Sequence, residues 1–180
     1  MSVVSWQTPL RNKSTMVETA PLFYDYLQTD IGRLVLAAGS DGLEHVFFHD
    51  HKGGELPVSW RHEPARLKNA FCQLNEYLSG KRQHFELPLA PRGTPFQVRV
   101  WQALREIPYG VTIAYGELAE RVDSPKGYRA VGNANGKNPL VIIQPCHRVV
   151  AAGGQLGGFS SGIHRKKYLL SLEKREGTLF

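Results

Sequence analysis

The sequence at residues 140–150 reads Leu140-Val141-Ile142-Ile143-Gln144-Pro145-Cys146-His147-Arg148-Val149-Val150. Its first four residues form a short apolar run rich in β-branched side chains, which predicts a buried strand. Pro145 cannot continue a central strand, so Cys146 is expected at the exit of that strand, where the chain turns. The stretch therefore places a thiol at the end of a core element.

Cys146 is a candidate nucleophile because ionisable residues follow it directly. Only the thiolate is strongly nucleophilic, and a free cysteine is about a few per cent ionised near neutral pH. His147 offers a base and Arg148 a cation. A Cys-His pair without further context is more often an inert cysteine beside a surface histidine, so the rest of the chain has to decide.

Length and composition are those of a globular protein. The chain has 180 residues, 42% hydrophobic and 21% charged, enough for one domain or two small ones. Two cysteines exclude a disulfide scaffold and suit a reducing compartment. No apolar run approaches the roughly 18 residues of a membrane span, and residues 1–20 lack the pattern of a signal peptide. We expect a cytoplasmic protein, or a nuclear one in a eukaryotic cell, without membrane contact.

The net charge of +6 is concentrated in the second half of the chain. Residues 1–93 hold ten basic and ten acidic side chains, whereas residues 94–180 hold twelve basic and six acidic ones. A basic half on a neutral half is typical of a protein that contacts a polyanion from one side. A solvated basic surface without a partner remains the alternative on charge alone.

The first half of the chain is predicted to be a small sheet with one helix. Residues 1–20 are polar and patternless, as in a mobile tail. Strand-like runs separated by glycine-containing turns predict a hairpin meander at residues 23–27, 34–37 and 43–48. A loop to residue 61, a helix at 65–78 and a candidate returning strand at 85–89 follow. Within that helix, Cys72 is predicted to be structural.

The second half is predicted to be mostly helical. The Pro/Gly-rich segment 88–95 marks the boundary between a tail with an amino-terminal α/β domain (1–20 and 21–90) and a carboxy-terminal domain (91–180). Amphipathic patterns and capping signals predict helices at 95–106, 115–122 and 125–135, and a last helix that Ser161 caps and that ends near residue 175. Two short helices joined by a tight turn on a basic half are typical of a helix-turn-helix.

The second helix of that pair has a face with almost no side-chain bulk. Gly127, Ala130 and Ala134 follow one another at helical spacing. Such a face allows close approach either to the floor of a DNA groove or to a packed neighbouring helix, and the pattern leaves both open. Arg129 lies beside this face and is long enough to reach into a base stack.

A glycine-rich loop and a carboxylate complete the candidate site. Residues 151–162 hold five glycines, so their backbone can wrap a flat ligand. In the last helix Glu173 lies on the same stripe as Leu169, and a carboxylate on a buried stripe needs a partner. His147 is the natural candidate, which gives a relay of nucleophile, base and orienting carboxylate through Cys146, His147 and Glu173.

These residues resemble a known family. Pro145 to Val150 is similar to the active-site signature of the O6-alkylguanine-DNA alkyltransferases, the methylated-DNA–protein-cysteine methyltransferases. Further motifs of that family match in order between residues 93 and 177, namely Gly93-Thr94-Pro95-Phe96-Gln97, Val100-Trp101, Ile107-Pro108-Tyr109-Gly110, Tyr115-Gly116-Glu117-Leu118-Ala119, Arg129-Ala130-Val131-Gly132-Asn133-Ala134-Asn135, Gly158-Phe159-Ser160 and Leu169-Leu170. The resemblance implies an α/β (α+β) fold, with a ribonuclease-H-like amino-terminal domain and a winged helix-turn-helix-like carboxy-terminal domain.

The resemblance also implies DNA repair by direct damage reversal. The thiolate of Cys146 would attack the alkyl group on O6 of guanine, and O4-alkylthymine is a further expected substrate. Because the thioether cannot be hydrolysed, each molecule acts once, as a suicide enzyme. The family further suggests that His147 takes the thiol proton through water, that Glu173 holds His147, and that Asn138 braces the turn before the active site.

Family roles also fall on residues that would face DNA. Tyr115 would donate a proton toward N3 of guanine, and Arg129 would fill the place of the flipped nucleotide. The helix face with Ala130, Gly132 and Ala134 would lie in the minor groove. The expected base pocket consists of Val149, Phe159, Ser160 and Ser161.

Three further expectations follow from the same comparison of motifs. Gln144 stands where the family usually has an apolar residue. Ser161 replaces a common glycine of the binding loop, and this larger side chain is expected to narrow the pocket against bulky adducts. No cofactor and no metal are expected, because the cysteines of the family's zinc site are absent. The expected partner is double-stranded DNA that contains O6-alkylguanine, bound by a monomer, with clustering on DNA left open.

Other functions fit the sequence less well. A non-catalytic sensor of alkyl lesions would lack the nucleophile, and Cys146 is present. A damage-induced regulator would need additional metal-binding and DNA-binding domains, for which the chain is too short. A cysteine hydrolase would need a peptide groove, and nothing in the sequence argues for one.

Overall fold

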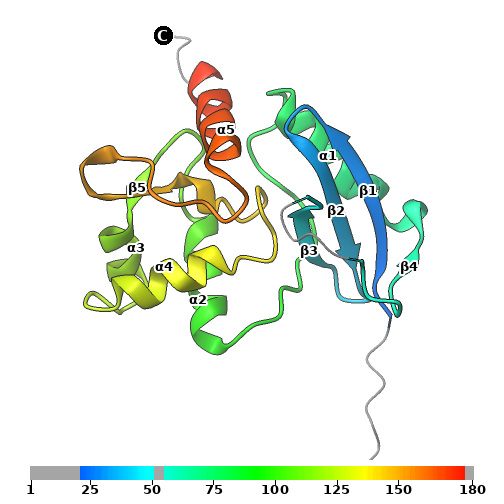
Figure 1. The fold of residues 1–180 in the computed structure, drawn as a ribbon, viewed down its shortest axis with the longest axis horizontal. Coiled ribbons are helices and arrows are strands. Elements are labelled where there is room, and N and C mark those ends of the chain that lie inside the picture. Colours follow the sequence, from blue (N-terminus) through cyan, green and yellow to red (C-terminus); the bar gives the residue numbers. More distant parts are fainter. Residues whose placement is uncertain (1–20, 51–54, 177–180) are drawn as a thin grey trace, which may run out of the picture.

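The fold is described by a computed structural model for residues 21–50 and 55–176. The segment predicted as a tail, residues 1–20, lies outside this part of the chain. Figure 1 shows the sheet on the right with one helix behind it, a group of short helices on the left, and the last helix between these two groups. The mixed α/β fold class is thereby confirmed.

The sheet comes from the first half of the chain. It contains β1 (Phe23–Thr29), β2 (Gly32–Ala38), β3 (Leu43–Phe48) and the short β4 (Arg61–His62), in the order β3-β2-β1-β4. The first three strands pair antiparallel, which confirms the predicted meander, and β4 pairs parallel to β1 in a segment predicted as loop. A 3-10 turn and α1 (Lys68–Leu78) follow. Cys72 on α1 is exposed, so its side chain does not belong to the buried core.

The helices of the second half begin with a well-capped one. Thr94 and Gln97 form a reciprocal capping box at the start of α2 (Pro95–Arg105). The other helices are α3 (Tyr115–Arg121), α4 (Tyr128–Gly136) and α5 (Ile163–Glu176), and the strands β5 (Ile113–Ala114) and β6 (Val149–Val150) pair parallel. Two predicted helix starts are wrong. α4 begins three residues later than expected, without a side-chain cap, and Ser161 precedes α5 by two residues.

Residues 140–143 are buried, but they form a turn and not the predicted strand. Leu140 makes one isolated parallel bridge to Val46, and Ile142 has a φ of 74°. The amide of Gln144 then donates to the carbonyl of Leu140 across the turn. A short apolar run shows that a segment is buried without showing its backbone conformation, which explains the error. The predicted return of residues 85–89 to the sheet is likewise reduced to one bridge, between Leu89 and Leu43.

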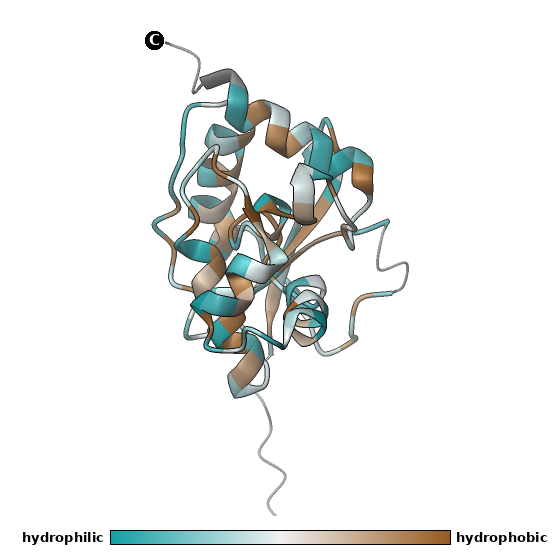
Figure 2. Ribbon diagram, turned by 90° about the vertical axis from the view of Figure 1, so that its left-hand side faces the viewer, coloured by the Kyte–Doolittle hydropathy of each residue, from teal (hydrophilic) through white to brown (hydrophobic). Residues whose placement is uncertain are grey.

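Two groups of buried side chains form the core, and the stretch around Cys146 crosses between them. The first lies between the sheet, α1, residues 140–143 and α5, and the second lies among α2, α3, α4 and β6. Ile143 belongs to the first group and Cys146 to the second. Figure 2 shows hydrophobic and hydrophilic segments alternating along the helices that enclose these cores. In the described part of the chain, no helix is long and apolar enough to cross a membrane.

Candidate active site

Cys146 opens a 3-10 helix (Cys146–Arg148), and its thiol is only 2% exposed. Asn138 holds the preceding turn from both sides. Its amide donates to the carbonyl of Gln144 at 2.7 Å and its side-chain oxygen accepts from the amide of Leu140 at 3.0 Å. Both bonds are buried, so the backbone leading to the thiol is fixed by side-chain contacts and not by a sheet.

The surroundings of the thiol favour its neutral form in the resting protein. Burial raises the pKa of Cys146 to about 11, although the Asn138 side chain and the nearby Lys166 charge act in the opposite direction. The Lys166 ammonium is fully buried and donates to the carbonyls of Val149 at 2.7 Å and Gly158 at 3.3 Å. A thiol in this setting needs a base at the moment of reaction.

His147 is fully buried, and its surroundings favour the neutral imidazole. Burial lowers its pKa, and the contact with Glu173 offsets only part of that effect. Its Nε2 lies 2.8 Å from Oε1 of Glu173, so a neutral ring donates its proton there and keeps a lone pair on Nδ1. Nδ1 has no hydrogen-bond partner among the residues that the structure describes. The ring is therefore oriented by the carboxylate and has one free acceptor nitrogen.

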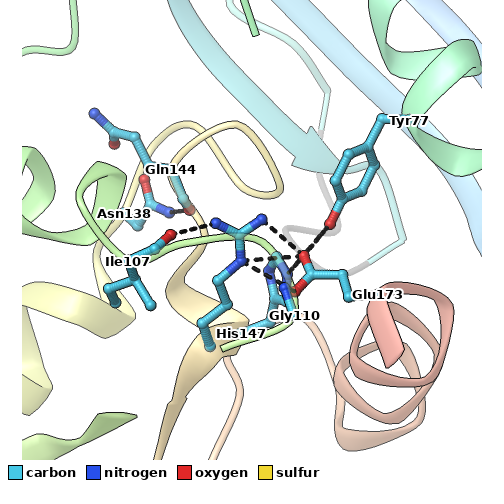
Figure 3. Close-up of polar contacts among 8 residues, drawn as sticks. Tyr77, Ile107, Gly110, Asn138, Gln144, His147 and Glu173 are labelled. Atoms are coloured by element: carbon cyan, nitrogen blue, oxygen red, sulfur yellow. Dashed lines mark hydrogen bonds and ion pairs between the residues drawn. The ribbon is translucent and has the colours of Figure 1, made fainter. Parts of the chain in front are cut away.

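Glu173 is the centre of a buried polar network formed with Tyr77, Gly110, His147 and Arg148, here called the Glu173 network (Figure 3). The guanidinium of Arg148 donates to both carboxylate oxygens at 2.9–3.1 Å. The amide of Gly110 donates to Oε2 at 3.0 Å, and the hydroxyl of Tyr77 donates to Oε1. Each carboxylate oxygen thus accepts hydrogen bonds from at least two residues, which is how a buried charge is stabilised.

The Glu173 carboxylate is held ionised by this network. Burial alone would raise its pKa, but the hydrogen bonds and charges of His147 and Arg148 outweigh burial and lower the pKa to about 2. Three members escaped the sequence analysis in this role, namely Tyr77, Gly110 and Arg148. Tyr77 comes from α1 in the other half of the chain, so no local pattern could connect it with Cys146.

Tyr115 and α4 lie beside the thiol. Tyr115 is half-buried, burial raises its pKa, and a hydrogen bond with Asn135 acts in the opposite direction. A side chain at Gly132 would meet the Tyr115 ring at 3.7 Å, so the helix packs closely against that ring. α3 and α4 are therefore fixed relative to the nucleophile.

The predicted bare helix face is only partly exposed. Arg129 and Ala130 face solvent and Gly132 is half-buried. Ala134 is 3% exposed and packs in the second core, where its carbonyl accepts a hydrogen bond from Trp101 at 2.9 Å. The small residue at 134 is thus explained by a neighbouring helix, which was the other reading of this pattern.

The glycine-rich loop closes the site on the side of α5. Val149 is buried, Phe159 is half-buried and packs against both cores, and Ser160 is exposed. Ser161 is 2% exposed. A cavity of about 230 Å³ separates this loop from the end of α4 and the sheet, and it is lined by Phe47, Gly136, Lys137, Asn138, Val141, Ser160 and Ser161. Among the described residues, no group of three or more His, Cys, Asp or Glu side chains could hold a metal ion.

A buried cysteine, a neutral histidine oriented by a carboxylate, and an adjacent helix pair on the basic half of the chain define a class of protein. The class is that of a DNA-acting protein with a cysteine nucleophile. The sequence comparisons agree with this class. Residues 95–175 match the family model described as 6-O-methylguanine DNA methyltransferase, DNA binding domain, and residues 22–91 match its ribonuclease-like domain.

Individual relatives cover nearly the whole described chain. A methylated-DNA–protein-cysteine methyltransferase of Methanosarcina barkeri is 46% identical over 154 residues, 85% of this chain and 98% of the relative. The O6-methylguanine methyltransferase structure of Mycobacterium tuberculosis is 42% identical with a TM-score of 0.80, over 88% and 96% of the two chains. The OGT of the same organism in complex with DNA is 43% identical with a TM-score of 0.79, over 85% and 93%. The chain belongs to the 6-O-methylguanine DNA methyltransferase family, whose members repair alkylated DNA by transferring the alkyl group to a cysteine of the protein.

Proposed function

We propose that this protein removes the alkyl group from O6-alkylguanine in double-stranded DNA, and from O4-alkylthymine, by a single irreversible transfer to Cys146. The observation that carries the assignment is the junction of the thiol with the Glu173 network. A buried His–Glu–Arg arrangement directly beside a cysteine is not needed for ordinary packing, and each of its buried charges requires compensation. It does have a role in generating a thiolate on demand.

The chemistry proceeds in one displacement. His147 takes the thiol proton through a water molecule on Nδ1 while Glu173 stabilises the imidazolium that forms. The sulfur of Cys146 bonds to the alkyl carbon as the carbon–O6 bond breaks, and the electron pair of that bond goes to guanine. Tyr115 supplies a proton to N3 of the leaving base. The thioether persists, so one protein molecule repairs one lesion.

The target base reaches Cys146 only after it leaves the duplex. An alkyl group on O6 inside a base pair is inaccessible to a thiol that is 2% exposed, and flipping costs a few kcal/mol. We assign Arg129, which faces solvent on α4, to the place that the flipped nucleotide vacates, with Ala130 and Gly132 at the minor groove. Ala134 would not touch DNA, and its small side chain would allow α2 and α4 to pack closely.

The flipped base would be received between Tyr115 and the glycine-rich loop. The buried backbone at Val149, the ring of Phe159 and the loop residues Ser160 and Ser161 form the far side of that space. Lys166 fixes the loop by joining the carbonyls of Val149 and Gly158. We propose that the protein acts as a monomer, because every group in this scheme comes from one chain.

The test is intact-mass analysis and peptide mapping after brief incubation with a duplex that carries one O6-methylguanine. One methyl group per protein, located on Cys146, is the expected result. No added mass with retained lesion-selective binding would replace the transferase by a non-catalytic lesion sensor. A methyl group on Cys72 would mean that the reaction is right and the nucleophile wrong.

A further inference from the structure

Arg165 is a buried arginine that the reaction scheme does not use. It lies in the first turn of α5 with 5% exposure, and its guanidinium contacts three separate backbone segments. Nε donates to the carbonyl of Ile31 at 2.8 Å, Nη1 donates to the carbonyl of Ser161 at 2.8 Å, and Nη2 pairs with Asp50. The first and third contacts belong to the sheet, and the second belongs to the glycine-rich loop.

The surroundings of this guanidinium are shaped to receive it. Its central carbon lies 4.0 Å from the centroid of the Phe48 ring, a cation–π distance. Gly32 has a φ of 120°, and a Cβ there would come within 2.7 Å of Nη2 of Arg165. A glycine at the start of β2 therefore lets the guanidinium approach the backbone of the sheet closely.

The loop end of this contact adjoins the reaction. Ser161 follows Ser160 in the segment proposed to receive the base, and Lys166 holds the same loop at Val149 and Gly158 from the neighbouring position on α5. Arg165 and Lys166 therefore hydrogen-bond to the carbonyls of this segment from adjacent positions on α5. Arg165 connects the loop by hydrogen bonds to the amino-terminal half, through the turn at Ile31 and through Asp50, two residues after β3.

We propose that Arg165 is a positioning residue through which the amino-terminal sheet holds the glycine-rich loop in its base-receiving position. The proposal rests on the proposed function and gives the amino-terminal half a task in substrate binding. Arg165 touches neither the thiol nor the base relay in this scheme. Loosening it should therefore weaken capture of the flipped base and leave the rate of alkyl transfer within the bound complex unchanged.

Arg165→Lys is the informative variant, because lysine keeps the charge but cannot direct a planar fork at three acceptors. Single-turnover rates at increasing protein concentration give a half-saturating concentration and a maximal rate on the O6-methylguanine duplex. We expect the half-saturating concentration to rise about five- to tenfold and the maximal rate to stay within about twofold. Hydrogen–deuterium exchange of the peptide covering 156–162 should accelerate about tenfold in the free protein.

Two other variants make the result interpretable. Arg66→Lys changes an exposed arginine of the amino-terminal half and should alter neither quantity. Asp50→Asn removes the charge of the outer contact, at a carboxylate that is 65% exposed, and should give a smaller shift in the same direction, even if Arg165→Lys fails to fold.

Unchanged exchange and half-saturation in folded Arg165→Lys would overturn the proposal, as would a fall confined to the maximal rate. Absence of transfer by the unsubstituted protein would instead overturn the proposed function. Loop exchange would still decide whether Arg165 holds the loop.

Discussion

The surroundings of Cys72 and Cys146 differ in almost every respect, although the side chains are identical. Cys72 is exposed on α1 and donates to Glu76 at 3.4 Å, a contact that raises the pKa of its thiol. Cys146 is buried, and its neighbours include a neutral histidine, an ionised carboxylate and a lysine. Exposure alone would make Cys72 the more reactive residue toward a small reagent. Toward a base flipped from DNA, a buried neutral histidine oriented by a carboxylate decides, and of the two cysteines only Cys146 lies beside one.

The largest effect is expected from substituting each cysteine in turn by alanine, which removes the thiol. Cys146→Ala should abolish methyl transfer while binding to the O6-methylguanine duplex persists, because the displacement has lost its nucleophile. Cys72→Ala should transfer at the unsubstituted rate. Counting methyl groups by mass spectrometry measures both. Methyl transfer that persists in Cys146→Ala would show that another residue is the nucleophile.

The next prediction tests whether the Glu173 carboxylate makes the surroundings of Cys146 reactive in a way that those of Cys72 are not. Glu173→Gln keeps the shape but removes the charge that stabilises the His147 imidazolium, so the maximal transfer rate should fall about 10²- to 10³-fold. Arg148 would then be buried without its counter-charge, and the melting temperature should fall as well. Glu76→Gln, beside Cys72, is the matched control and should leave transfer unchanged. Equal losses in both variants would show that the rate follows general stability.

A third prediction concerns the stability of the folded protein in acid, which depends on the Glu173 carboxylate. The pKa of Glu173 is lowered to about 2 from 4.5, so the unfolded chain binds a proton that the folded chain refuses. The stabilisation is complete above pH 4.5 and is lost as the pH falls toward 2, by about 3 kcal/mol. Denaturant unfolding across this range measures it. Glu173→Gln should remove this part of the pH dependence, and an identical acid profile would contradict the assignment.

Sequence patterns predict some elements of the molecule correctly and leave others unpredicted. The sheet meander, α1, α2 and α3 follow from periodicity and turn residues, and the position of Glu173 on the apolar stripe of the last helix already pairs it with His147. The turn at 140–143 could not be predicted, because an apolar run fits a strand and a buried turn equally well. Tyr77, Lys166 and Arg165 act through contacts between distant segments, which no single-sequence period reports. The domain boundary near residue 91 stays a prediction.

The smallest effect is expected at Tyr77, which decides whether the amino-terminal half belongs to the chemistry or only to the scaffold. Its hydroxyl donates to Oε1 of Glu173 and lies 3.4 Å from Nε2 of His147. Tyr77→Phe removes this donor and keeps the ring, so Glu173 retains its bonds to His147 and Arg148. The transfer rate should fall about three- to tenfold, as expected when one buried hydrogen bond worth about 1 kcal/mol is lost.

The pH dependence of that variant separates positioning from packing. With one donor fewer, the Glu173 carboxylate attracts the His147 proton more strongly, so the pKa of His147 should rise. The acid limb of the pH–rate profile should therefore move to higher pH in Tyr77→Phe. Tyr24→Phe, at a half-buried tyrosine of β1, should shift neither rate nor profile. A lower rate with an unmoved acid limb would show that Tyr77 supports the fold alone, and that the base relay belongs wholly to the carboxy-terminal half.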